Sequence, residues 1–172
     1  EMGKIRVSDK GLAGGPFILD MNYFVPADDC SSPIDLVQGT WFFDTTNATT
    51  GAEGQGVPSG CTSSVKKDLW YRFLATQSGT LTVSTCSGVF GGSTSQDTKI
   101  ALYSASECPI GPAIACNDDA GAACAANSLH SIVSTPVVIG QTIMIQLGQV
   151  STTANIFGNF GISITGSPAP PT

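Results

Sequence analysis

The sequence predicts an all-β protein: a jelly-roll-like β-sandwich of about eight core strands, preceded by an N-terminal strand extension. Short segments that alternate apolar and polar residues recur along the chain, and glycines such as Gly79, Gly140 and Gly158 separate them. No window combines helical periodicity with capping residues. Charged residues make up only 12% of the chain, whereas Gly, Ser and Thr are abundant, as in many extracellular β-proteins.

The expected core strands are, in chain order, residues 40–45, 68–75, 80–86, 97–104, 113–117, 129–135, 141–148 and 159–165. Alternation is clearest in 80–86 and in 141–148. The aromatic runs at 41–43 and 70–73 are expected to lie mostly in the core rather than to form a sugar-stacking platform. Two long loops, 46–64 and 87–96, complete the sandwich, which ends in a Pro-rich tail at 167–172.

Residues 1–27 differ from the rest of the chain and are treated as an N-terminal β-strand extension. They hold three basic and three acidic residues, so the whole net charge of −6 lies in the remainder. Two strand-like segments flank a Gly/Pro breaker at 11–16. The apolar positions of these segments are Ile5 and Val7, and then Phe17, Leu19, Met21 and Tyr23. The extension has three open fates: pairing with its own sheet edge, acting as linker, or inserting into the next subunit as an assembly strand.

The bulk charge argues against two classes of partner. The seven basic residues form no dense patch and the net charge is −6, so nucleic acid and anionic membranes are not expected partners. The chain has no run of about 20 apolar residues that would span a membrane. It starts at Glu1 without a signal-peptide pattern, so a secreted protein is expected to have lost that peptide already.

The six cysteines indicate disulfides and therefore a secreted, extracellular protein. They form no CxxC pair and have no histidine at zinc-like spacing, so zinc is not expected. Fifteen pairings are possible, and the sequence does not choose among them. The favoured set is Cys108 with Cys116 across a short Pro-rich loop, Cys30 with Cys61, and Cys86 with Cys124.

Several motifs, taken together in order, resemble one bacterial family. They are Asp28-Asp29-Cys30, the run 67–73, the run 78–86, Asp97-Thr98, Leu102-Tyr103, the run 116–119 and the closing run 161–164. Residues 28–166 resemble the pre-peptidase C-terminal (PPC-like) domains, which are secreted CUB-like jelly rolls attached to hydrolases and surface proteins. The resemblance implies a non-catalytic module that often binds calcium, and it does not extend to residues 1–27.

Acidic and amide side chains concentrate where two of the expected strands begin and end. Asn117, Asp118 and Asp119 end one strand, and Asp97 starts an earlier one, with Asp29 or Asp28 as further donors. Calcium prefers about six to eight such oxygens, and close carboxylates repel one another unless they are neutralised. The sequence therefore predicts a Ca²⁺ site; the alternative is an Asx-rich turn whose side chains cap backbone amides.

Catalysis finds little support. The chain has one histidine, His130, no Gly-x-Ser-x-Gly elbow and no nucleotide-binding glycine pattern, so no catalytic residue is assigned. Asn47 begins an Asn-Ala-Thr sequon, which predicts a glycan if the source glycosylates, the alternative being a plain polar loop.

The sequence thus favours a non-catalytic, cell-surface structural subunit that self-assembles head to tail into a fibre through its N-terminal strand. A calcium-dependent accessory module of a secreted hydrolase, binding polysaccharide or protein, is the alternative.

Overall fold

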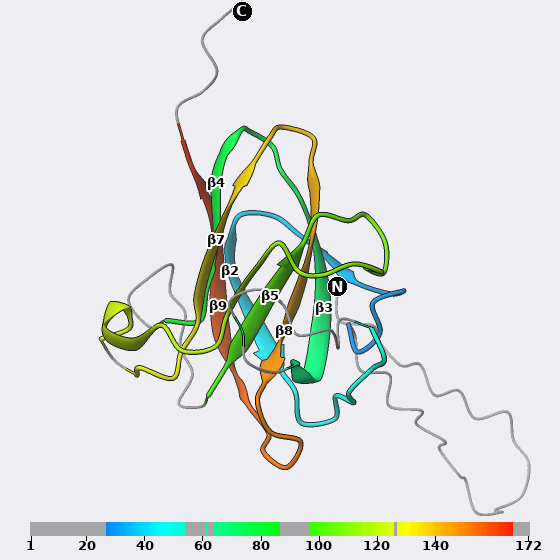
Figure 1. Ribbon diagram of the computed structural model, residues 1–172, viewed down its shortest axis with the longest axis vertical. Helices are drawn as coiled ribbons and strands as arrows, with labels where there is room; N and C mark the ends of the chain where they lie inside the picture. Colours follow the sequence, from blue (N-terminus) through cyan, green and yellow to red (C-terminus); the bar gives the residue numbers. More distant parts are fainter. Residues whose placement is uncertain (1–26, 54–60, 62–63, 87–96, 126, 167–172) are drawn as a thin grey trace, which may run out of the picture.

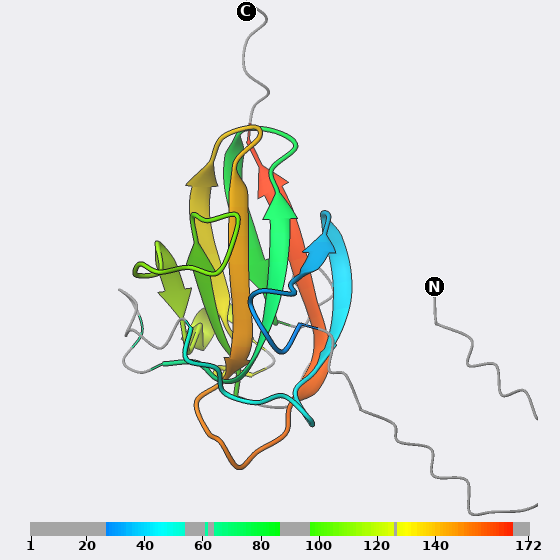
Figure 2. The same ribbon diagram turned by 90° about the vertical axis from the view of Figure 1, so that its right-hand side faces the viewer.

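The computed structural model describes residues 27–53, 61, 64–86, 97–125 and 127–166, and confirms an all-β, sandwich-like fold of two facing sheets (Figures 1 and 2). In these residues the strands are β1 (Ile34–Leu36), β2 (Gly39–Asp44), β3 (Lys66–Leu74), β4 (Gly79–Ser84), β5 (Lys99–Tyr103), β6 (Ala115–Asn117), β7 (Ile132–Val137), β8 (Thr142–Gln149) and β9 (Phe157–Thr165). A short 3-10 turn, η1 (Gly121–Ala123), lies between β6 and β7.

One sheet has five strands in the order β1-β3-β8-β5-β6, and the other has four in the order β2-β9-β4-β7. Neighbouring strands are antiparallel except β1, which runs parallel to β3. Each of the eight expected strands is present, although β7 starts at Ile132 rather than at residue 129. The sequence missed β1, because three residues, two of them exposed, are too few to show a period-2 pattern.

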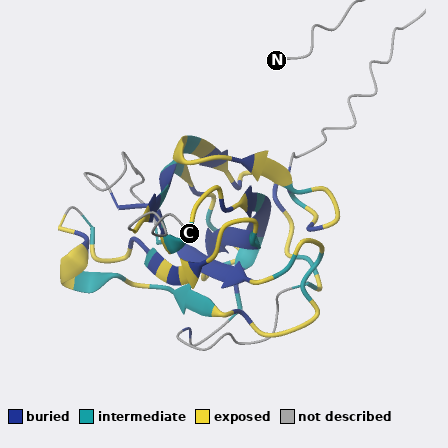
Figure 3. Cartoon of the chain, turned by 90° about the horizontal axis from the view of Figure 1, so that it is seen from above, coloured by how far each residue is buried: buried dark blue, intermediate teal, exposed yellow. Residues whose placement is uncertain are grey.

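The main core lies between the two sheets, because one cluster of buried apolar residues draws on strands of both layers. Figure 3 shows the buried stretches of these strands in dark blue. Alternation along β8 and β9 explains this: one face of each strand carries aliphatic or aromatic side chains that are almost fully buried. Phe160 is at the centre, with its ring centroid 5.0 Å from that of Tyr71 and 6.1 Å from that of Phe43. Of the run at 41–43, however, only Phe43 is core; Trp41 is partly buried and Phe42 is 65% exposed.

A second cluster covers the other face of the five-stranded sheet. Trp70 from β3 packs there against Tyr103 from β5, with ring centroids 5.6 Å apart, and against Met144 from β8. Ala113, which follows β5, and Cys30, which precedes β1, pack over these side chains. Trp70 is fully buried, so the expectation that this aromatic strand is core is confirmed.

Three disulfides hold the loops, and two of the three expected pairings were wrong. The bonds join Cys30 to Cys108, Cys61 to Cys116 and Cys86 to Cys124, with Cα atoms 5.1, 5.7 and 5.4 Å apart. Only Cys86–Cys124 was expected. Cys116 is held in β6 opposite Ala101, whereas Cys108 lies in the loop that folds over the face of the sheet onto Cys30, so the short Pro-rich loop does not bring Cys108 and Cys116 together.

The predicted assembly strand, with Ile5, Val7, Phe17, Leu19, Met21 and Tyr23, lies outside the described residues. Within the described ranges, no helix is long and apolar enough to cross a membrane.

Candidate functional site

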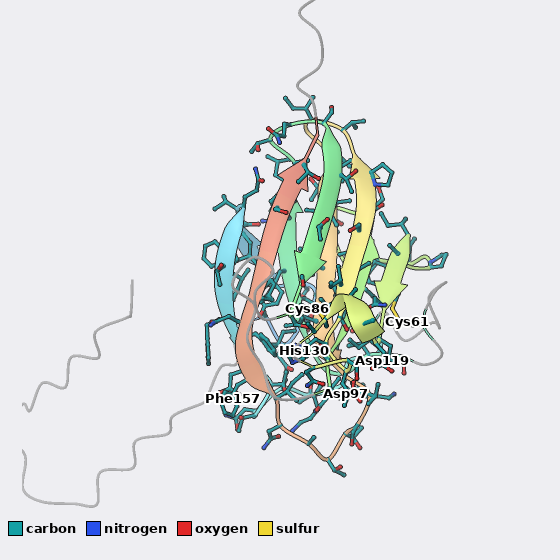
Figure 4. The ribbon with its side chains drawn as sticks, turned by 90° about the vertical axis from the view of Figure 1, so that its left-hand side faces the viewer. Cys61, Cys86, Asp97, Asp119, His130 and Phe157 are labelled. Atoms are coloured by element: carbon teal, nitrogen blue, oxygen red, sulfur yellow. A yellow bond between two sulfur atoms is a disulfide. The ribbon has the colours of Figure 1, made fainter. Side chains whose placement is uncertain are left out.

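Three carboxylates come together at one end of the sandwich. One oxygen from each of Asp97, Asp118 and Asp119 lies within 4.8 Å of the other two. Figure 4 shows Asp97 and Asp119 at this end, with Cys61 and Cys86 in the same region. We refer to these three residues as the acidic cluster.

The strand pairing explains why residues about twenty positions apart in the chain meet here. β5 and β6 are antiparallel, with Ile100 opposite Asn117. Asp97 lies two residues before the start of β5, and Asp118 and Asp119 directly follow the end of β6. In an antiparallel pair the start of one strand lies beside the end of the other, so the three side chains share one end of the sheet.

Two of the predicted metal ligands accept backbone hydrogen bonds. The Asn117 side-chain oxygen accepts a hydrogen bond from the backbone N–H of Ile132 at 2.9 Å, which ties β6 to β7, and its amide nitrogen donates to the Asp119 carbonyl at 3.4 Å. Asp29 accepts a bond from the Ser31 backbone N–H at 2.8 Å, which holds the pKa of Asp29 below its usual value. Its carboxylate lies beside Cys30 and Cys108 and belongs to a different group.

Asp28, the other additional donor considered, is also engaged elsewhere. Its two carboxylate oxygens accept bonds from the backbone N–H and the hydroxyl of Thr49, at 2.6 and 3.0 Å. Asp29 thus caps a backbone amide two residues further on, as in an Asx turn, and Asp28 anchors the loop that follows β2.

Sequence reasoning overlooked Lys99, the residue that partly neutralises the acidic cluster. The Lys99 side chain is fully buried, and its ammonium nitrogen lies 3.0 Å from Asp118 Oδ2. The signal was available in the sequence: a lysine inside a strand of otherwise apolar residues needs an anionic partner, because an unpaired buried charge is very costly. Asp118 supplies that partner.

The single ammonium of Lys99 does not neutralise all three carboxylates of the acidic cluster. Burial, together with the charges of Asp118 and Asp119, raises the pKa of Asp97, and Lys99 opposes that rise. Three carboxylates face one ammonium, and one oxygen each of Asp97 and Asp118 is enclosed without a hydrogen-bond partner among the described residues. A hard cation would satisfy these oxygens, with the rest of its coordination supplied by backbone carbonyls and water.

A buried hydroxyl network fixes the backbone behind the cluster. Thr85 Oγ1 and Thr98 Oγ1 are 2.7 Å apart, and Thr85 Oγ1 accepts the backbone N–H of Ser131 at 3.0 Å. The Ser131 hydroxyl lies 2.6 Å from the carbonyl oxygen of Thr98 and 2.7 Å from that of Asp118. The network joins the segments beside β4, β5 and β7, so hydrogen bonds to neighbouring segments fix the backbone of Asp118.

Asn47 of the sequon is exposed in the turn that follows β2. This is a position that a glycosyltransferase can reach, although the Thr49 hydroxyl of the same sequon is bonded to Asp28. Glycosylation therefore stays a prediction.

Comparison with models of known protein families and with curated proteins gave no match. The similarity to PPC-like domains accordingly rests on the sequence motifs alone.

Proposed function

We propose that the chain is a non-catalytic, extracellular structural subunit that polymerises head to tail, with residues 17–24 of one copy added as a strand to the β2 edge of the next. The observation that carries this proposal is the β2 edge, which contains no proline and has exposed aromatic side chains beside it. Three disulfides support an oxidising compartment, as an extracellular subunit requires.

Of the four strands at the sheet margins, three are short or protected. β1 and β6 have three residues each. β7 contains Pro136, which cannot donate to a further strand, and its first residue is bonded to Asn117. These are devices by which β-proteins prevent unwanted strand addition.

Among the described residues, none of these devices is found on β2. It has six residues with no proline, and in the described part of the chain it pairs with a strand only on its β9 side. Figure 2 shows it at the outer margin of the sandwich. On the outer face, Phe42 is 65% exposed and Phe157 of β9 is 59% exposed, so apolar side chains lie beside the edge Trp41–Asp44.

The sequence of residues 17–24 suits this edge. Phe17, Leu19, Met21 and Tyr23 share one face of a predicted strand, so an added strand would bury about four apolar side chains. Their burial would contribute roughly 6–12 kcal/mol before the entropy of association is subtracted. A head-to-tail contact of this kind does not close on itself and therefore generates a filament.

Deletion of residues 1–24 is expected to abolish assembly. The intact chain should elute as high-mass species in size exclusion and form fibres in electron microscopy, whereas the deletion should elute as a monomer. Assembly should also be lost in Leu19→Asp with Met21→Asp on the apolar face, and retained in the matched pair Asp20→Asn with Asn22→Ser on the opposite face.

The acceptor edge has its own matched pair. Phe42→Lys beside the edge should weaken assembly, and Thr80→Lys, which is also exposed on the four-stranded sheet but lies on an interior strand, should not. If the intact chain stays monomeric at high concentration, or assembles equally well without residues 1–24, the proposed function is wrong.

The acidic cluster supports a second candidate, a calcium-dependent accessory module of a secreted hydrolase. Here the ion would join the segments before β5 and after β6 and so fix the loops at that end. Lys99 reduces the affinity, because its ammonium already neutralises part of the negative charge.

Calcium is expected to raise the melting temperature relative to chelator, and Asp119→Ala should remove that rise. If calcium binding raises the free energy of unfolding by about 1 kcal/mol, the melting temperature of a domain of this size should rise by roughly 2–4 °C. Asp44→Ala, which removes an exposed carboxylate on β2, is the control and should keep the rise. Identical melting curves with calcium and with chelator would exclude the ion site.

A further inference from the structure

His130 is the most unusual polar side chain of the described residues. It is 1% exposed, and neither of its ring nitrogens has a hydrogen-bond partner in the part of the chain that the structure describes. Buried polar groups are nearly always hydrogen-bonded, so an imidazole in this state calls for an explanation. Its neighbours provide one: a nitrogen of His130 and the sulfur atoms of Cys86 and Cys124 all lie within 4.8 Å of one another.

Three separate segments bring these atoms together. Cys86 follows the end of β4, Cys124 follows η1, and His130 lies two residues before the start of β7, next to the buried Ser131. Figure 4 shows His130 and Cys86 in the same region at the lower end of the sandwich. The backbone of His130 is held on both sides, since its carbonyl accepts the Ala120 N–H at 2.7 Å and its own N–H donates to Asn127 O at 3.1 Å.

The histidine position therefore does not depend on the disulfide alone. The hydroxyl network of Thr85, Thr98 and Ser131 also joins the segment that carries Cys86 to the segment that carries His130. Reduction of the disulfide would leave two thiols and an unbonded imidazole facing one buried space. Thiolate sulfur and imidazole nitrogen are the ligands that zinc prefers in proteins.

We propose that Cys86, Cys124 and His130 form a redox-gated zinc site, closed as a disulfide in the oxidised protein and able to bind Zn²⁺ when the disulfide is reduced. A phosphine reductant and one water break the sulfur–sulfur bond, giving the phosphine oxide and two thiols. Zn²⁺ then displaces the two thiol protons and binds one imidazole nitrogen, with water in the fourth position. This site is distinct from the acidic cluster, whose oxygen ligands suit a hard cation.

The other two disulfides lack this arrangement. Neither a histidine nor a carboxylate of the described residues joins the Cys61–Cys116 pair in a ligand group. The Cys30–Cys108 pair has Asp29 nearby, but that carboxylate is exposed and accepts the Ser31 N–H. Cys61 and Cys116 therefore serve as an internal control for thiols without an imidazole.

The test uses the full chain, reduced with a phosphine, and Co²⁺ and Zn²⁺ as probes. Native near-ultraviolet dichroism, to which the buried Trp70 contributes, identifies the reduced samples that remain folded. In these, Co²⁺ should give the intense visible bands of tetrahedral thiolate coordination, and Zn²⁺ should remove them. Zinc should protect Cys86 and Cys124 from alkylation, as mapped by mass spectrometry, and leave Cys61 and Cys116 reactive.

His130→Phe is the decisive variant, because it keeps both cysteines and replaces an unbonded ring with an apolar one of similar size. We expect its zinc affinity in the reduced state to fall by at least about tenfold, the loss that even an outer-shell change causes at metal sites. The oxidised wild type should show no such cobalt bands. Equal affinity in His130→Phe, protection of other cysteines instead, or loss of the native spectrum before Cys86–Cys124 opens would each overturn the proposal.

Discussion

Replacing Lys99 with methionine is expected to lower the free energy of unfolding by about 3 kcal/mol at pH 7, the usual effect of removing one partner of a buried ion pair. Methionine has nearly the same length, so the change removes the charge with little change in volume. The fully buried ammonium 3.0 Å from Asp118 is then gone, while Asp97, Asp118 and Asp119 remain close together. Chemical denaturation in the presence of chelator measures the loss.

The decrease in the free energy of unfolding caused by Lys99→Met should become smaller as the pH falls. The pKa of Asp97 is raised in the folded protein, so protonation of this carboxyl stabilises the fold below its unfolded pKa, and that stability is lost as pH rises through the raised value. A protonated Asp97 removes one negative charge from the cluster and lessens the need for Lys99. Calcium should also restore more stability to Lys99→Met than to the wild type, if the cluster binds it.

Arg72→Met is the matched control. Arg72 pairs with Asp35 through two hydrogen bonds, but the two side chains are 41% and 70% exposed. An exposed pair contributes at most about 1 kcal/mol, so this variant should differ little from the wild type. Equal losses in the two variants would mean that burial of Lys99 does not set the strength of its pairing.

Replacing Trp70 with alanine is expected to lower the free energy of unfolding by about 3–5 kcal/mol. Trp70 is fully buried in the second cluster, where its removal leaves a large cavity beside Tyr103 and Met144. The variant also loses a hydrogen bond, because the indole N–H donates to Asp68 Oδ2 at 2.9 Å. Urea denaturation followed by circular dichroism measures both effects together.

Trp70→Phe separates the two contributions. It keeps most of the ring volume and removes the donor, so the loss should be about 1–3 kcal/mol, the range for a buried polar group left short of a partner. Asp68 keeps its bond from Gln146, at 2.9 Å, and Gln146 in turn accepts from the Tyr103 hydroxyl at 2.8 Å.

Burial raises the pKa of Asp68. The loss in Trp70→Phe should therefore be larger above that raised pKa, where Asp68 is ionised and needs its donors, than below it. A loss in Trp70→Phe as large as that in Trp70→Ala would show that the bond to Asp68, rather than packing, gives Trp70 its importance.

Period-2 alternation was sufficient to locate most strands, because long strands with one buried face repeat the same signal several times. It worked for β8 and β9, where apolar side chains alternate over eight or nine residues. It failed for β1, and it could not show that Phe42 is exposed beside a buried Phe43. Alternation gives the two faces of a strand but not which of them another layer covers.

The sequence predicted the three carboxylates of the acidic cluster, because the positions of the strands could be read from it. Asp97 was expected beside Asp118 and Asp119 because they border consecutive strands, and antiparallel pairing of β5 with β6 does place them together. Asn117 was assigned because it ends the same strand as Asp118 and Asp119, and Asp29 as a further oxygen donor, but backbone N–H groups of Ile132 and Ser31 bond to their oxygens. Such competition between a ligand role and a backbone role depends on geometry, which residue type does not reveal.

By itself the sequence determined the all-β class, the positions of the long strands and the presence of disulfides, because these follow from local pattern and composition. Only the tertiary structure decided which cysteines pair, that Lys99 faces Asp118, and that His130 lies beside Cys86 and Cys124. These contacts join residues that the fold brings together from distant strands and loops. Local periodicity carries no information about such distances, so the packing of the two sheets and their loops sets them.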